Sequence, residues 1–192
     1  MSRRSGQAYL ESLLAVLLLL LALFGALQTA LLFGEREVMH HAAARAARAR
    51  TVGFNDWMAE KAARVASIPV SGRLLSDAVG WDGGGEDAAD SQAAFELARI
   101  PFYLGAENRA RAEWILDYEE WKNGRFSFSS AAEGPGGGVL EFRALHDAPL
   151  SMPLGHLAVP FSRMDDEGVP RFTVEGGGVA GNHSGYYLEG SR

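Results

Sequence analysis

The chain contains no cysteine and little proline, and both shortages limit what it can be. Without thiols it forms no disulfide, no thiolate metal site and no cysteine nucleophile. Only seven of the 192 residues are proline, and the first of them is Pro69. A helix that starts near the N-terminus can therefore continue for more than sixty residues without a proline to interrupt it.

Motifs that carry chemistry are also missing. There is no G-x-S-x-G nucleophile, no phosphate-binding loop and no dinucleotide-binding glycine pattern. The acidic cluster at residues 164–168 lacks the alternating ligands of a calcium loop, so we interpret it as a solvated turn. The histidines are scattered without a metal-binding spacing (His40, His41, His146, His156 and His183). We therefore expect no enzyme, no cofactor and no metal.

Charge is divided unevenly along the chain. Residues 1–66 hold eight basic and five acidic side chains, whereas residues 67–192 hold ten basic and nineteen acidic ones. An acidic main domain argues against nucleic acid as a partner. The basic stretch that follows the apolar run could contact anionic lipid head groups or an acidic neighbour, or it could be a solvated helix face.

The most prominent positive feature is an apolar run over residues 13–33. Its only polar side chains are Gln28 and Thr29. A helix of this length covers about 31 Å, close to the ~30 Å thickness of bilayer hydrocarbon. Because the apolar part of a secretory signal is only about 7–15 residues long, we predict a retained transmembrane helix.

The helical pattern continues after the run, through residues 35–66. Alanine and arginine favour a helix there, and we predict one long helix over residues 8–66. Gly53 is its expected weak point, and a break near Gly34 is the alternative. Small residues recur at 3-4-3-4 spacing, which would let another helix approach closely (Met39, Ala42, Ala46, Ala49 and Gly53).

The remaining residues, 67–192, predict a small head of helices and an antiparallel sheet. We expect a helix over residues 90–99 that Pro101 interrupts, and a second over 106–121 that stops at Gly124. Trp114, Tyr118 and Trp121 should lie together in the core. Residues 125–129 and 139–144 should form a hairpin, with a further strand at 171–175 and a glycine-rich tail from Gly176. The fold class is α+β.

Glu11 stands at the edge of the apolar run, after the short basic head of Arg3 and Arg4. A carboxylate costs free energy at the edge of a membrane span, although less than the ~2.5–3.5 kcal/mol of a charge at the centre. An isolated acid at this position is therefore a candidate functional group, and the alternative is an acid that extends to the lipid head groups.

The segment Gly6-Gln7-Ala8-Tyr9-Leu10-Glu11 resembles the processing signature of type IV pilins and pseudopilins. Within that superfamily the chain looks most like a TadE-type pseudopilin of the tight-adherence pilus system. The resemblance implies a leader over residues 1–6, which a prepilin peptidase cuts between Gly6 and Gln7. Residues 7–34 would then be the membrane span, 35–66 its soluble continuation and 67–192 a pilin-like head.

The resemblance also implies a function. The chain would be a minor pilin or pseudopilin in the bacterial inner membrane, with its head in the periplasm and possible incorporation into a pilus. Its partners would be the peptidase, other pilin subunits, the assembly platform and lipid. The new amine on Gln7 of one subunit would pair with Glu11 of its neighbour and set the register. The alternative is a single-pass envelope scaffold or binding protein that does not polymerise.

The distribution of basic residues points the other way on orientation. Arg36, Arg45, Arg48 and Arg50 follow the apolar run, and they outnumber Arg3 and Arg4 before it. Since basic residues near a span favour the cytoplasm, this count favours a cytoplasmic head. The pilin interpretation requires the opposite orientation.

Overall fold

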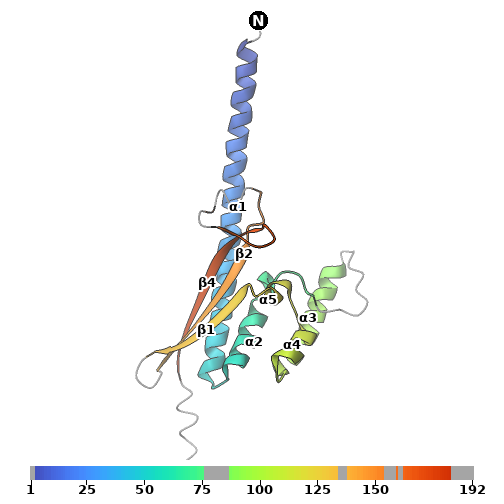
Figure 1. The fold of residues 1–192 in the computed structure, drawn as a ribbon, viewed down its shortest axis with the longest axis vertical. Helices are drawn as coiled ribbons and strands as arrows, with labels where there is room; N and C mark the ends of the chain where they lie inside the picture. Colours follow the sequence, from blue (N-terminus) through green and yellow to red (C-terminus); the bar gives the residue numbers. More distant parts are fainter. Residues whose placement is uncertain (1–2, 76–86, 134–137, 154–158, 160–161, 183–192) are drawn as a thin grey trace, which may run out of the picture. The chain divides into compact units, whose positions relative to one another are not determined.

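The computed structural model describes residues 3–75, 87–133, 138–153, 159 and 162–182, and the chain is an α+β protein (Figure 1). As the sequence predicts, a long N-terminal helix precedes short helices and an antiparallel sheet. The helices are α1 (Arg3–Thr51), α2 (Asp56–Ala66), the 3-10 turn η1 (Ile68–Val70), α3 (Asp87–Gly105), α4 (Arg109–Ile115) and α5 (Glu119–Lys122). The strands are β1 (Phe126–Glu133), β2 (Val139–Pro149), β3 (Arg163–Met164) and β4 (Pro170–Gly181).

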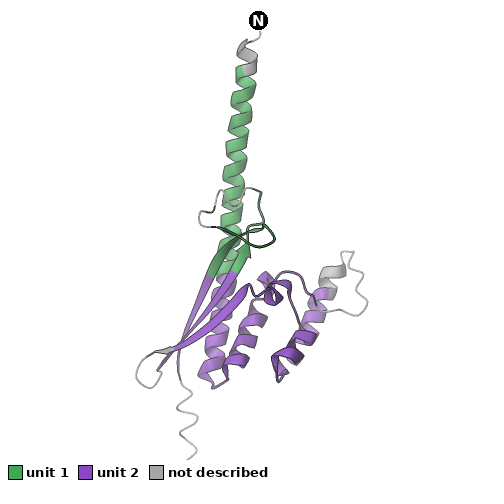
Figure 2. Ribbon diagram, in the orientation of Figure 1, with its two compact units in different colours: residues 1–36, 147–174 green, residues 37–146, 175–192 purple. Residues whose placement is uncertain are grey.

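The chain divides into two compact units, each made of two separate segments (Figure 2). Unit 1 comprises residues 1–36 and 147–174, and unit 2 comprises residues 37–146 and 175–192. Each unit therefore combines part of α1 with part of the sheet.

Helix α1 ends at Thr51 in a glycine cap. Gly53 has a φ of +88°, and its N–H donates to the carbonyl of Arg50 at 3.0 Å. The N–H of Phe54 donates to the carbonyl of Ala49 at 3.2 Å. This pair of bonds is the Schellman motif, which satisfies the last carbonyls of a helix and requires a left-handed residue.

The prediction of one helix over residues 8–66 is therefore wrong at Gly53, because α1 ends just before this residue and a second helix, α2, begins at Asp56. The expected weak point is a complete break, and Gly34, the alternative site, lies inside continuous helix. Helix α2 begins with its own cap, because the side chain of Asn55 accepts a hydrogen bond from the Met58 N–H at 2.8 Å.

Helix α3 runs through Pro101 to Gly105, so the prediction that this proline interrupts the helix is wrong. Proline removes one backbone donor, whose helical acceptor would be the carbonyl of Leu97. Leu97 is exposed, and water can hydrogen-bond that carbonyl instead. The end of the helix is further stabilised by Lys61, whose ammonium donates to the carbonyls of Leu104 at 2.5 Å and Ala106 at 2.8 Å.

The predicted helix over residues 106–121 is divided into α4 and α5, because residues 116–118 adopt extended backbone. Their hydrogen bonds go to another segment: Leu75 N–H donates to Asp117, and Tyr118 forms a β-bridge with Leu74. The interruption changes which side chains share a face. Tyr118 and Trp121 are buried as predicted, but Trp114 is 88% exposed, so its assignment to the core is wrong.

The predicted stop at Gly124 and the hairpin that follows are confirmed. Gly124 has a φ of +68°, and its N–H and that of Arg125 close a second Schellman motif on Trp121 and Glu120. Strand β1 then pairs antiparallel with β2, from Phe126 opposite His146 to Glu133 opposite Val139. Alternate β2 residues are buried (Leu140, Phe142, Ala144, His146 and Ala148).

Strand β4 extends to Gly181, so the glycines from Gly176 onward form a strand and not the predicted tail. Their lack of a side chain explains the difference. A Cβ on Gly176 would overlap the backbone of Met39, and one on Gly178 would lie 2.5 Å from the carbonyl carbon of Ala43. The strand can therefore contact the backbone of α1 directly within unit 2. Residues 183–192 lie outside the described part of the chain.

Candidate functional site

The residues of the pilin-like signature lie in the first turns of α1. Gly6 and Gln7 are helical, and Glu11 follows Gln7 by one turn, on the same face of the helix. Every residue from Gln7 to Leu20 is exposed, including Glu11. Most of these side chains are large and apolar, so this surface is suited to lipid or to another apolar helix.

This stretch belongs to the one helix in the described part of the chain that is long and apolar enough to cross a membrane. Its hydroxyl groups are satisfied internally: Ser12 donates to the carbonyl of Ala8 at 2.9 Å, and Thr29 to that of Gly25 at 2.8 Å. Such local bonds allow hydroxyl side chains to face lipid at low cost. The finding is compatible with a single-pass anchor.

Gln28, the other polar residue of the apolar run, is only 1% exposed. Its amide oxygen accepts a hydrogen bond from the backbone N–H of Met152 at 2.9 Å, within unit 1. Gln28 is therefore used to attach the segment after β2 to the helix. Sequence reasoning identified this side chain as polar but assigned it no partner.

The predicted seam of small residues is largely buried inside the subunit. Met39, Ala42 and Ala46 are fully buried, whereas Ala49 is half-buried and Gly53 is exposed at the helix cap. Ala43 and Ala47 complete the buried stripe in their place. Strand β4, and not a second helix, lies against Met39 and Ala43.

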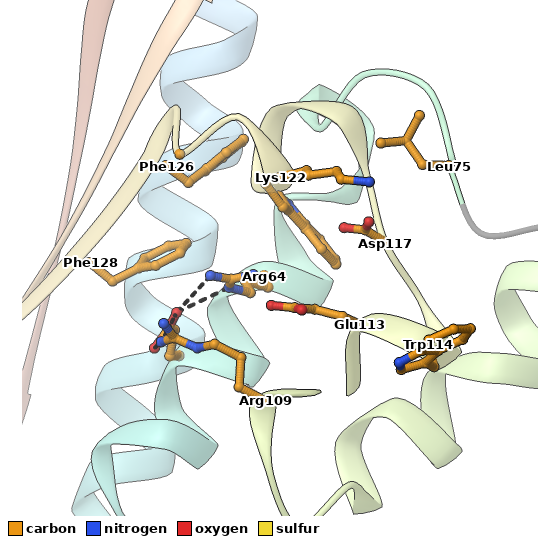
Figure 3. A pocket seen from close by; sticks show the side chains of 12 residues that line it. Arg64, Leu75, Arg109, Glu113, Trp114, Asp117, Lys122, Phe126 and Phe128 are labelled. Atoms are coloured by element: carbon orange, nitrogen blue, oxygen red, sulfur yellow. Dashed lines mark hydrogen bonds and ion pairs between the residues drawn. The ribbon is translucent and has the colours of Figure 1, made fainter. Parts of the chain in front are cut away.

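Unit 2 contains a cleft of about 910 Å³ that the sequence did not predict (Figure 3). Phe126 and Phe128 of β1 lie on one side, and Trp114 lies on the other, at the end of α4. Arg64 of α2 and Arg109 of α4 lie between them. The remaining lining residues come from the same elements and the segments that join them (Glu60, Leu75, Glu113, Asp117, Trp121, Lys122 and Gly124).

An ion network crosses the cleft. Glu60 accepts from Arg64, one helical turn away, at 2.8 Å, and from Arg109 at 2.9 Å. Arg64 also lies over the ring of Trp121, 5.7 Å from its centroid. The spacing of Glu60 and Arg64 is a sequence signal for an ion pair on one helix face. Nothing in the sequence connects Arg109 to it, 49 residues from Glu60.

Asp117, on the α4–α5 side of the cleft, is an acid of the lining whose ionisation the fold changes. Burial raises the pKa of this carboxyl, and the neighbouring charge of Lys122 partly opposes that shift. Burial also lowers the pKa of Lys61, beside the end of α3. Among the described residues there is no group of three His, Asp or Glu side chains that could hold a metal ion.

Two of the three described histidines, His40 and His146, have structural contacts, and His41 is exposed on α1. Nδ1 of His40 lies 3.1 Å from the backbone N–H nitrogen of Gly177, which donates to it. His146 is buried, its ring stacks on Phe126 at 4.3 Å, and its Nε2 lies 3.7 Å from Glu120. The two side chains lie on different elements with different neighbours, and neither is part of a metal site.

The acidic cluster at residues 164–168 forms the turn between β3 and β4, as the sequence suggests. Asp165 accepts from the N–H groups of Glu167 and Val169 and from Nε of Arg171 at 2.6 Å. The hydrogen bond from Arg171 holds the pKa of the Asp165 carboxyl below its usual value. The carboxylate oxygens of Asp165 are therefore engaged in hydrogen bonds that stabilise the turn.

Comparison of the chain with protein-family models, with curated proteins and with solved structures gives no match. The functional interpretation therefore depends on the residues and their geometry alone.

Proposed function

We propose that this chain is a minor pilin or pseudopilin, a membrane-inserted structural subunit of a type IV-like pilus of the tight-adherence kind. A prepilin peptidase would remove residues 1–6, and the rest would assemble through its N-terminal helix. The observation that carries the proposal is the spacing of Gly6 and Glu11 directly before an apolar helix.

The exposure of that helix supports an assembly role. The side chains from Gln7 to Leu20 are all exposed, and none of the other residues that the structure describes buries them. Apolar helices gain little from hydrophobicity when they associate inside lipid, so a specific polar contact is needed to choose the partner and the register. In this part of the helix Glu11 is the only charged side chain.

Pairing explains how a carboxylate is tolerated there. Cleavage after Gly6 would create a cationic amine on Gln7. Two opposite charges in apolar surroundings are costly when alone and much less costly together. If the amine of one subunit meets Glu11 of the next, the contact would fix the axial position of neighbouring helices.

The proposal is tested by mass spectrometry of the chain co-expressed with a prepilin peptidase. We expect loss of residues 1–6, and Gly6→Val should block it. Gly34→Ala is the matched control, because Gly34 is in the same helix with open space around it. A chain that stays uncleaved would contradict the proposal.

Assembly is tested separately with Glu11→Gln. We expect this variant to be cleaved and inserted but not incorporated into filaments. Glu37→Gln, an exposed acid later in the same helix, should assemble normally. Equal incorporation of both variants would argue for a plain anchor.

A membrane-anchored scaffold that does not polymerise is the second candidate. The basic residues Arg36, Arg45, Arg48 and Arg50 after the apolar run favour it, because they favour retention of the head in the cytoplasm. Protease treatment of intact spheroplasts tests the orientation. Protection of the head would contradict the pilin and leave the scaffold, whereas digestion of the head would meet the requirement of the pilin and leave the choice to Glu11→Gln.

A further inference from the structure

Among the residues that the structure describes, strand β1 is an edge strand of the sheet. The strand order β1-β2-β4-β3 leaves β1 with one neighbour. Edge strands in natural proteins are usually short, charged, bulged or interrupted by proline, which prevents other chains from pairing with them. Strand β1 is eight residues long, has no proline, and carries no charge before its last residue, Glu133. Its outer edge is therefore suited to an added strand.

The backbone of β4 differs in this respect. At Gly177 a side chain from α1, His40, accepts the backbone N–H at 3.1 Å. A partner strand could not use that donor without displacing the imidazole. The two strands of unit 2 therefore differ. The His40 side chain hydrogen-bonds to the backbone of β4, whereas no hydrogen bond among the described residues joins a side chain to the backbone of β1.

The cleft of unit 2 lies beside β1. Phe126 and Phe128 project from the strand into it, and Trp114 and Glu113 of α4 lie across from them (Figure 3). Helix α4 thus lies across the cleft from β1, and the space between them is where an added segment could lie. A volume of about 910 Å³ is at the upper end of the ~300–1,000 Å³ range of ligand sites.

The charges of the lining indicate the chemistry of the occupant. Three acids face three bases, and Glu60 already binds Arg64 and Arg109. A balanced lining favours neither an acidic nor a basic ligand. The exposed contact surface comes instead from Phe128 and from Trp114, and tryptophan is among the residues that most often dominate binding energy.

We propose that this cleft binds an extended, uncharged peptide segment of a partner protein. The main chain of the segment pairs with the outer edge of β1, and its alternate side chains contact Phe128 and Trp114. This mode of recognition takes affinity from backbone hydrogen bonds and specificity from the cleft. It goes beyond assembly of the anchor and holds whether or not the chain polymerises.

The test uses the full chain in lipid nanodiscs and a capped heptapeptide of alternating threonine with valine or tyrosine. We expect saturable binding with a Kd below about 1 mM, followed by tryptophan fluorescence. Trp114→Ala should weaken binding about tenfold or more, and so should N-methylation of alternate peptide bonds in the probe. Phe102→Ala removes an aromatic ring of similar exposure outside the cleft and should leave the Kd unchanged.

Three results would overturn the proposal. The first is no binding of the heptapeptide at about 1 mM. The second is that the N-methylated peptide binds as tightly as the unmodified one, or that the Trp114→Ala chain binds the heptapeptide as tightly as the original chain. The Trp114 side chain is exposed, so its removal costs no packing. The third is that Ser129→Lys on β1 changes the sedimentation of the chain without peptide, which would identify a second copy as the occupant of this edge. None of these results depends on cleavage after Gly6.

Discussion

Two parts of helix α1 differ in a way that their composition does not suggest. Residues 7–20 are almost entirely apolar and are exposed at every position. The stretch from Met39 to Ala47 is rich in alanine, carries two histidines and one arginine, and contains fully buried residues (Met39, Ala42, Ala43, Ala46 and Ala47). The more hydrophobic part of the helix is the one that the fold leaves uncovered.

The difference shows that two kinds of packing operate in one helix. In unit 2 the small side chains allow β4 to approach the helix backbone, so burial depends on shape. In the first part the side chains are exposed and no other described residue buries them, which is the surface expected of a helix that lies in a bilayer. The predictions below test whether the two parts respond to different changes.

The largest effect is expected where the buried part meets the sheet. Gly178→Ala places a Cβ against the carbonyl carbon of Ala43, and the strand must move away from the helix. We expect a loss of about 3 kcal/mol in the free energy of unfolding of the head. Chemical denaturation followed by tryptophan fluorescence measures this loss.

The neighbouring glycine gives the control. Gly177→Ala meets nothing within 4 Å and should change stability by a few tenths of a kcal/mol. If both variants unfold at the same denaturant concentration, then close contact between β4 and the helix does not stabilise unit 2.

In the exposed part of α1 we expect an effect of similar size on a different property, the free energy of membrane insertion. Leu17→Arg puts a charge inside the apolar run, near its start, and should cost membrane insertion somewhat less than the ~2.5–3.5 kcal/mol of a charge at the centre. The fraction of the chain that resists alkaline extraction from membranes measures it. Because Leu17 is exposed, the same variant should leave the unfolding of the head unchanged, and a coupled loss of both would remove the distinction between the two parts.

A smaller effect is expected at Gln28, which lies between the two parts. Gln28→Leu replaces the amide with an apolar side chain of similar size and leaves the Met152 N–H without its acceptor. We expect a cost of about 1–3 kcal/mol, localised to unit 1. Hydrogen exchange should become faster at Met152 and stay unchanged at the β1–β2 hairpin. An unchanged rate at Met152 would show that this bond does not hold the segment.

Local signals predicted the ends of elements better than their continuity. Gly53 and Gly124 were both expected to mark weak points or stops, and each forms a Schellman cap, because a left-handed residue after a helix is a local requirement. Pro101 gave a misleading signal, since a lost donor near a helix end can be compensated by solvent. Trp114 was misplaced because residues 116–118 pair with the segment before α3.

The sequence alone determined that the chain begins with an apolar helix of membrane-spanning length, that Glu11 lies near its start, and that a hairpin follows Gly124. These properties depend on composition, spacing and turn chemistry within a few residues. Only the tertiary structure decided that β4 covers Met39 and Ala43, that Gln28 holds Met152, and that Arg109 joins Glu60 beside an open strand edge. Each of these contacts joins residues far apart in the chain, and local preferences carry no information about which distant surfaces have complementary shape and charge.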